Sequence, residues 1–200
     1  MKARIERARA VSGIVFFLCW LAADASALSL RLEPGSGVLD LGDPLSVDLV
    51  VDDLSPEVIG AFQVGIDFDP AVLDYQGASS DDSLGVPGLQ TVFGGSESPG
   101  NANVFEVSFL SQAQLSAIQG DSLVLATLSF VGVGAGESAL SFSQTDLSDA
   151  FARPLAIDER VGATVTVNDP IPQPGAALLF AVGAAVLAAS RRSARGNAGA

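Results

Sequence analysis

The chain has 200 residues, a formal net charge of −13 and no histidine, and its one cysteine is Cys19. The charge is uneven, because residues 28–174 carry three arginines, no lysine and 21 acidic residues, a net charge of −18, while both ends are net basic. We call residues 28–174 the body. Because the body is so acidic, it repels phosphate groups, and we expect no nucleic-acid partner. The lack of histidine excludes a Ser-His-Asp or Cys-His nucleophile and a histidine-bound zinc site, and the cysteine-free body excludes disulfides.

Residues 1–27 have the three parts of a secretory signal peptide. Residues 2–9 are basic, residues 11–23 form a short apolar core, and Ala25-Ser26-Ala27 precedes Leu28 as an A-x-A cleavage site. We therefore expect signal peptidase to cut between Ala27 and Leu28, after the export machinery has engaged the chain. An uncleaved anchor helix is the alternative.

Residues 28–168 show a period-two alternation of apolar and polar residues, which indicates half-buried strands separated by turn residues. Many short strands at this spacing predict an all-β antiparallel sandwich. The side chains expected to face its core are Leu28, Leu30 and Leu32; Leu45, Val47, Leu49 and Val51; Phe62, Val64, Ile66 and Phe68; Phe105, Val107 and Phe109; Val124, Ala126, Leu128 and Phe130; Leu140 and Phe142; and Val161, Ala163, Val165 and Val167.

Three connecting segments are predicted from their composition. Residues 78–103 are rich in Gly, Ser and Asp and are expected to form a long surface excursion, whereas residues 111–118 are expected to form a helical turn. The glycine-rich residues 132–136 predict a hairpin turn. A phosphate-binding loop is disfavoured there, because no lysine is present, no helix follows, and Glu137 opposes a phosphate.

Three stretches of the body resemble cohesin-like domains. Residues 61–75, AFQVGIDFDPAVLDY, are similar to the family's strand that ends in Asp-Pro and Val-Leu, and residues 125–143, LATLSFVGVGAGESALSFS, are similar to a later hairpin. Residues 45–54 fit the opening strand. The resemblance covers nearly all of residues 28–168. It implies a jelly-roll β-sandwich, akin to some carbohydrate-binding modules, whose best-known members dock calcium-loaded dockerins.

Calcium is the one cofactor that the acidic residues suggest. Asp67 and Asp69 are two apart on a predicted strand, so their carboxylates leave the same face, and oxygen ligands of this kind suit calcium. Asp52-Asp53 or Asp81-Asp82 are candidates to complete the site. The spacing of an EF-hand loop is absent, however, and a solvated acidic face is the alternative.

The C-terminal end has a proline motif, an uncharged apolar segment and a basic cluster, in that order. Pro172, Gln173 and Pro174 end a linker over residues 169–174, and residues 175–190 follow as an expected transmembrane helix. This segment of 16 residues is slightly short of the roughly 17–25 that span a bilayer. The arginines after it are expected to stop transfer and keep residues 191–200 in the cytoplasm. They are Arg191, Arg192 and Arg195.

This order resembles the C-terminal sorting tail of PEP-CTERM proteins, in which a Pro-Glu-Pro-type motif, a transmembrane segment and a basic cluster follow one another. Gln173 departs from the family pattern, which has glutamate at that position. The resemblance implies that an exosortase-type membrane enzyme recognises and removes the tail, in a Gram-negative bacterium that makes extracellular polysaccharide. A permanent single-span anchor is the alternative.

Together these features predict an exported, non-enzymatic adhesion or binding module without catalytic residues. It would be an inner-membrane-anchored precursor first and then reach the cell surface or the extracellular matrix, where a polysaccharide or a dockerin-like protein is the expected partner. The first alternative is a polysaccharide-binding module, which would gather exposed aromatic side chains on one flat face. The second is a glycoside hydrolase, which would place two carboxylates about 5–10 Å apart in a cleft. Tyr75, the one tyrosine, and the lack of tryptophan in the body disfavour a hydrolase and sugar binding through stacked aromatics, whereas sugar binding through polar loop groups stays open.

Overall fold

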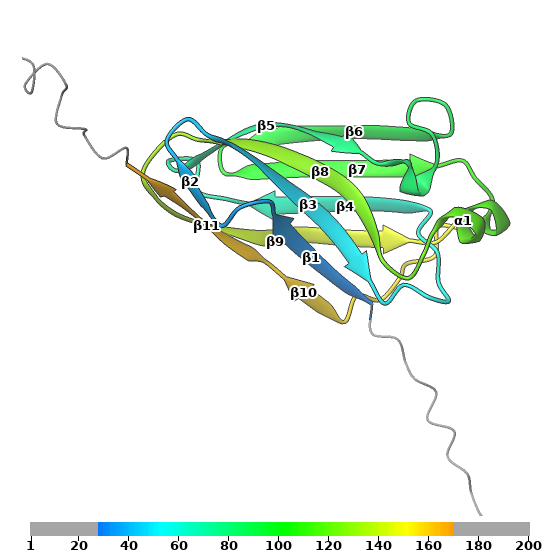
Figure 1. Ribbon diagram of the computed structural model, residues 1–200. Helices are drawn as coiled ribbons and strands as arrows, with labels where there is room; N and C mark the ends of the chain where they lie inside the picture. Colours follow the sequence, from blue (N-terminus) through cyan, green and yellow to red (C-terminus); the bar gives the residue numbers. More distant parts are fainter. Residues whose placement is uncertain (1–27, 170–200) are drawn as a thin grey trace, which may run out of the picture.

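Residues 28–169, the part of the chain that the computed structural model describes, contain eleven strands, the helix α1 and the short 3-10 turn η1 (Figure 1). In chain order the elements are β1 (Ser29–Pro34), β2 (Val38–Asp40), β3 (Pro44–Asp52), β4 (Ala61–Asp67), β5 (Leu73–Ser80), η1 (Asp82–Leu84), β6 (Thr91–Ser98), β7 (Asn101–Ser108), α1 (Gln112–Ile118), β8 (Leu123–Gly132), β9 (Gly136–Ser148), β10 (Glu159–Val161) and β11 (Ala163–Asn168).

The strands form two sheets that pack face to face, which confirms the predicted all-β sandwich (Figure 1). The five-stranded sheet has the order β10-β1-β3-β8-β5, and the six-stranded sheet has the order β2-β11-β9-β4-β7-β6. Neighbouring strands are antiparallel except for the pairs β1–β10 and β2–β11, which are parallel. The edge strands β5 and β6 contact each other, so they border the same side of the sandwich.

The core between the sheets consists mainly of leucine and valine side chains from the central strands, as the alternation predicted for β1, β3, β4 and most of β8. Val124 is the exception, because a register shift between β3 and β8 leaves Leu123 and Leu125 buried and Val124 half-buried. Phe130 is its largest fully buried side chain, and Phe68 and Tyr75 pack edge-on against the Phe130 ring at centroid distances of 5.3 and 5.5 Å. Each such fully buried apolar side chain stabilises the fold by roughly 1.5–3 kcal/mol. The helix α1 confirms the predicted helical turn, and Gln114 Oε1 accepts a hydrogen bond from the Ser111 N–H at its start.

The prediction for β7 was wrong by one residue in phase. Phe105 and Val107 point outward and are exposed, and so is Phe109, whereas Ala102, Val104 and Glu106 face the core. The error has a physical cause, because β7 carries apolar residues on both faces and alternation gives a strand's period but not which face is buried. A buried glutamate is the exception that hydrophobicity does not anticipate.

Two strand predictions fail at sheet edges. Residues 78–103 are not a surface excursion, because they contain the end of β5, the turn η1, all of β6 and the start of β7. Both β5 and β6 are edge strands, which tolerate Gly and Ser because they contact only one neighbour within their sheet. Val161, predicted to face the core, is exposed because the edge strand β10 belongs to the five-stranded sheet while the following β11 belongs to the other.

The glycine-rich residues 132–136 do not form a hairpin turn. They connect β8 of the five-stranded sheet to β9 of the six-stranded sheet, and these two strands do not pair. The connection crosses close to the turn before β5, where the Val133 N–H donates to the Val72 carbonyl at 2.8 Å. A Cβ at Gly134 would lie 2.1 Å from the Ala71 carbonyl oxygen, so only glycine fits. Local alternation cannot tell a paired hairpin from such a crossing.

Glu106 has no exposed surface, and neither of its carboxylate oxygens has a hydrogen-bond partner of good geometry in the described residues. Burial raises the pKa of Glu106. The hydroxyl groups of Thr91 and Ser80 lower it in part, and the charge of Asp81 adds a small upward contribution. Because the net direction is upward, the fold favours the neutral acid over a buried carboxylate, which would be costly to desolvate.

We expect Glu106→Gln to stabilise the protein at alkaline pH, because it keeps the side chain's size and removes the charge. The wild type should lose stability as the pH rises from the unfolded glutamate pKa, about 4.3, through the raised folded pKa, since the unfolded state releases this proton first. The variant lacks this loss. Its melting temperature by circular dichroism should exceed that of the wild type at pH 8. The difference should be roughly 3–5 °C for each kcal/mol of stability that the wild type loses when the buried Glu106 ionises.

The difference in melting temperature between Glu106→Gln and the wild type should shrink towards pH 4. The exposed control Glu137→Gln should show no such pH-dependent difference. A Glu106→Gln variant that melts below the wild type at pH 8 would contradict a raised folded pKa of Glu106.

Candidate functional site

The outer face of the six-stranded sheet carries exposed apolar side chains where β6 and β7 pair. Phe105 is 37% exposed and Val107 is 41% exposed, because alternate residues of β7 point away from the core. Val92 lies opposite Val107 in the register and is 50% exposed. Phe109 follows just beyond the end of β7 and is also exposed. We call Val92, Phe105, Val107 and Phe109 the apolar patch.

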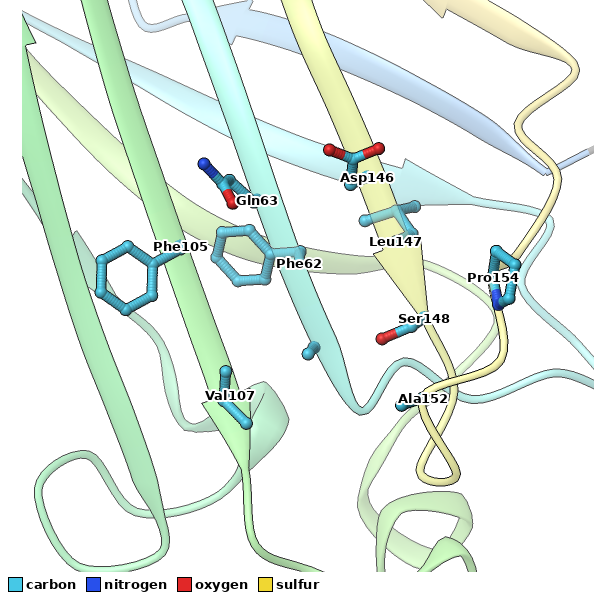
Figure 2. A pocket seen from close by; sticks show the side chains of 10 residues that line it. Phe62, Gln63, Phe105, Val107, Asp146, Leu147, Ser148, Ala152 and Pro154 are labelled. Atoms are coloured by element: carbon cyan, nitrogen blue, oxygen red, sulfur yellow. The ribbon is translucent and has the colours of Figure 1, made fainter.

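A hollow of about 470 Å³ lies on the same face, beside the apolar patch (Figure 2). Phe105 and Val107 from β7 form one side, and β4 lines the middle. Asp146 and Ser148 lie across from them on β9, and Pro154, in the loop after β9, forms part of the wall. Three adjacent strands and one loop therefore present a surface that is apolar on one side and polar on the other.

Gly94 positions the Phe105 ring. The two residues lie directly opposite each other in the β6–β7 register, and a Cβ at Gly94 would come within 2.7 Å of a ring carbon of Phe105. The ring therefore lies over the backbone of β6 at Gly94. A side chain there would push the ring away, so the glycine keeps Phe105 flat against the sheet with one face open.

The loop that walls the hollow, residues 149–154, is held together by Asp149. Its Oδ1 accepts hydrogen bonds from the backbone N–H groups of Phe151 and Arg153 at 2.8 and 2.9 Å. Its Oδ2 accepts from the Arg153 guanidinium at 2.6 Å. Burial raises the pKa of Asp149, but the hydrogen bonds from Arg153 and Phe151 together with the Arg153 charge outweigh that effect and leave the pKa lowered.

Gly60 lets this loop pack closely against the start of β4. A Cβ at Gly60 would lie 2.6 Å from the Asp149 carbonyl oxygen, and the Gly60 N–H donates to the Ser148 carbonyl at 2.8 Å. The Gly60 carbonyl accepts from the Ser108 N–H, also at 2.8 Å. The backbone at Gly60 thus ties the ends of β7 and β9 together at the hollow, so the position of the loop is fixed.

The polar side of the hollow carries acidic and uncharged polar side chains and no basic side chain. Asp146 accepts a hydrogen bond from the Gln144 amide at 2.7 Å, and no arginine lines the hollow. In residues 28–169 the guanidinium groups are engaged elsewhere. Arg31 pairs with two carboxylates of its own sheet, Arg153 pairs with Asp149, and Arg160 donates to Thr145.

The structure does not join the two calcium candidates into one site. Asp67, at the end of β4, accepts a hydrogen bond from the Asn101 amide at 2.6 Å. Asp69 lies beyond the strand, where its carboxylate accepts from the Ala71 N–H at 2.8 Å and so caps a turn. Within residues 28–169 no three Asp, Glu, His or Cys side chains are grouped so that they could hold a metal ion. Calcium binding at these residues stays a prediction.

Most of the other predicted site residues lie outside the described residues. These are Ala25 and Ala27 of the signal cleavage site, Pro172, Gln173 and Pro174 of the sorting motif, and Arg191, Arg192 and Arg195 of the stop-transfer cluster. Leu28 is the first described residue; it is buried, and its carbonyl accepts from the Asp158 N–H at 2.9 Å. Among the described residues, no helix has the length and apolar character to cross a bilayer.

Sequence reasoning missed the apolar patch because it assigned Phe105, Val107 and Phe109 to the core. The signal that pointed the other way was Asn101 and Asn103. These residues share a face with Phe105 and Val107, and two buried asparagines in a row would be costly. The loop at residues 149–154 gave no sequence signal for its place beside the hollow.

Solved structures of similar shape are cohesin domains. A type II cohesin domain from the cellulosome of Acetivibrio cellulolyticus gives a TM-score of 0.58 at 13% identity, over 70% of this chain and 95% of that chain. The fold is cohesin-like. A type I cohesin–dockerin complex from Clostridium thermocellum, Coh-OlpC with Doc435, gives a TM-score of 0.58 at 14% identity, over 72% of this chain and 94% of that chain.

The likeness extends beyond cellulosomes. A non-cellulosomal cohesin from the hyperthermophilic archaeon Archaeoglobus fulgidus gives a TM-score of 0.54 at 13% identity, over 70% of this chain and 91% of that chain. No family model matches the sequence, and no curated protein matches it either. At these identities the likeness establishes the cohesin-like fold and the predicted sandwich.

We expect Asp149→Asn to loosen the loop at residues 149–154 in a pH-dependent way. The lowered folded pKa of Asp149 contributes stability above the unfolded aspartate pKa, about 3.9, and this contribution is lost as the pH falls through the folded value. Asp149→Asn should therefore lower the melting temperature at pH 7 and have a smaller effect at pH 3. Amide hydrogen exchange should rise at Phe151 and Arg153. An equal melting-temperature loss at both pH values would rule out the charged contribution.

Proposed function

We propose that residues 28–169 form a non-enzymatic protein-binding module that docks a dockerin-like protein through the apolar patch and the hollow. One observation carries the proposal. Phe105 and Val107 stand exposed at the edge of a shaped hollow, on a sheet face that nothing in the described chain covers. The complexes of cohesins with dockerins among the structurally similar proteins support a partner of this class.

The chemistry of this surface suits a protein partner. An aromatic ring and a valine at the centre, surrounded by amide, hydroxyl and carboxylate groups, match the apolar core and polar rim of protein interfaces. Phe105 is held in place by Gly94, and the loop wall is held by Asp149, so little ordering entropy opposes binding. A pre-formed site of this kind concentrates its binding energy in a few anchors.

The charge of the body favours a basic partner. Residues 28–174 have a net charge of −18, and Asp146 lies in the hollow without a facing arginine. A partner with lysine or arginine near its contact surface would be attracted over distances near the Debye length, about 8–10 Å at physiological salt. The association rate should therefore fall as salt is added.

A glycoside hydrolase is disfavoured because it needs an accessible carboxyl group with a raised pKa as its general acid. Burial raises the pKa of Glu106, but this carboxyl group has no exposed surface. It therefore cannot reach a substrate.

Delivery completes the proposal. The signal peptide and its cleavage before Leu28 take the body out of the cytoplasm, and the tail that begins at Pro172 holds the precursor in the inner membrane. An exosortase-type enzyme then removes the tail, and the module reaches the cell surface or the polysaccharide-containing matrix. The three-part order of the tail is what supports this route.

Docking is tested with dockerin-like domains from the same genome, displayed as a library on yeast and probed with the full chain. The variants Phe105→Ser and Val107→Ser should each weaken capture by about 30-fold or more, as expected for a hot-spot residue worth about 2 kcal/mol. Both side chains are exposed, so the fold should survive.

The matched control is Val133→Ser, which changes an equally exposed valine in the connection between β8 and β9. It should leave capture unchanged. Equal capture by the wild type and by both patch variants would place the docking surface elsewhere, and no capture of any dockerin-like domain would overturn the partner class.

Sorting is tested by the intact mass of the mature protein from fractionated cells. We expect a chain that begins at Leu28 and lacks residues 191–200, because signal peptidase and the exosortase-type enzyme have both cut. A mature protein that still carries Arg191 and Arg192 would show that the segment is a permanent anchor. A mass that includes residues 1–27 would show an uncleaved signal.

A further inference from the structure

The open side of the sandwich, between the edge strands β5 and β6, contains two adjoining hollows. One has a volume of about 310 Å³ and the other about 400 Å³, and Tyr75 and Glu97 line both of them. The two hollows adjoin at these residues along the sandwich edge, and we call the pair the edge groove. None of its lining residues belongs to the apolar patch or to the hollow beside it.

Aromatic side chains line the edge groove along its length. Phe68 lies in the first hollow, Phe93 in the second, and Tyr75 at the junction. All three are partly buried and pack against the core, so their positions are fixed. The Tyr75 ring is braced by its edge-on contact with Phe130. Burial raises the pKa of Tyr75, and so does the charge of Glu97, so its hydroxyl stays protonated as a hydrogen-bond donor.

Polar side chains line both rims. Asp74 and Gln76 come from β5, and they share a hydrogen bond of 2.6 Å between the Gln76 amide and the Asp74 carboxylate. Ser96, Glu97 and Ser98 come from β6. An apolar aromatic floor with hydrogen-bonding groups on both sides is the arrangement of a small-molecule or polymer site rather than of a dry interface.

We propose that the edge groove binds an uncharged polysaccharide. Sugar rings have apolar C–H faces that pack on aromatic rings, and their hydroxyl groups donate to carboxylates and accept from amide and hydroxyl groups. The two joined hollows accept more than one sugar ring in a row. An anionic polymer such as a polyuronate is repelled by Asp74, Glu97 and the net charge of −18 on residues 28–174.

An extended peptide is the other occupant that two facing strand edges suggest, since strand addition uses unpaired backbone groups. The edge of β5 is poorly suited to it. The register with β8 shifts between Tyr75 and Gly77, so a bulge at Gln76 bends this strand in the middle of the groove. Bulges of this kind twist an edge away from further pairing.

The test is affinity electrophoresis of the full chain, in a zwitterionic detergent without sugar groups, through gels that contain one polymer each. The probes are a mixed-linkage β-glucan, a galactomannan, a soluble xylan and polygalacturonate. We expect retardation by at least one uncharged polymer and none by polygalacturonate. No retardation by any uncharged polymer, or retardation by polygalacturonate alone, overturns the proposal. Release of reducing ends would also overturn it, because the groove would then be catalytic.

Variants locate the binding. Tyr75→Ala should lower affinity by about 10-fold or more, as expected for the loss of a stacking aromatic worth roughly 1.5 kcal/mol. Because Tyr75 also packs on Phe130, Ser96→Arg is the second variant; Ser96 is exposed and lines the second hollow, where a long charged side chain should obstruct the polymer and abolish retardation. The matched control Ser46→Arg, on the outer face of the five-stranded sheet, should bind as the wild type does.

Retardation that survives Ser96→Arg would place the polysaccharide outside the groove. Binding of an extended peptide that Ser96→Arg abolishes, in a protein that no uncharged polymer retards, would assign the groove to a peptide instead. The patch variant Phe105→Ser should bind polysaccharide normally, so failure of this proposal is distinguishable from failure of dockerin docking.

Discussion

The register of β7 between β4 and β6 decides which side chains this protein offers to a partner. With Glu106 turned into the core, Phe105 and Val107 must face outward, because alternate residues of a strand point to opposite faces. Shifting the pairing by one residue would bury the two apolar side chains and expose the glutamate, but it would also bury Asn101 and Asn103 and expose Ala102 and Val104. In the observed register β7 pairs along its whole length with β4 on one side and with β6 on the other. The structure therefore retains the cost of a buried acid while its outward face carries an apolar surface.

How far the sequence predicts this structure depends on where a strand lies. The central strands β3, β4 and β8 have neighbours on both sides and one face in the core, so their alternation is strong and Val47, Val64 and Leu128 were placed correctly. The edge strands β5 and β6 escaped prediction, because an edge tolerates glycine and serine as a loop does. Sheet membership also escaped it at residues 132–136, since the crossing from β8 to β9 has the same local composition as a hairpin. The candidate site lies on the edge strand β6 and on β7, whose apolar residues lie on both faces. The alternation of apolar and polar residues alone could therefore not give its position.

Small residues at close approaches help to hold the site in place on the outer face of the six-stranded sheet. Gly60 allows the loop at residues 149–154 to contact the start of β4, and Gly94 allows the Phe105 ring to lie across β6. Asp149 then satisfies backbone donors in the loop that would otherwise lack partners. The apolar surface is thus pre-formed, which is the property that separates a binding site from a patch of exposed hydrophobic residues.

The path of β9 relates the docking surface to the point where the chain leaves the sandwich. β9 begins at Gly136, which pairs with Val167 near the end of β11, and it ends at Ser148 in the wall of the hollow. A strand of 13 residues spans about 40 Å at roughly 3.3 Å per residue. The hollow therefore lies at the end of the sandwich opposite to the exit of the C-terminal tail, and the described chain likewise begins and ends at opposite ends (Figure 1). In the proposed precursor, whose tail would anchor it in the membrane, the proposed docking surface would thus belong to the end of the sandwich far from Asn168. The edge groove lies along the flank between β5 and β6, and its lining residues are distinct from those of the apolar patch and of the hollow.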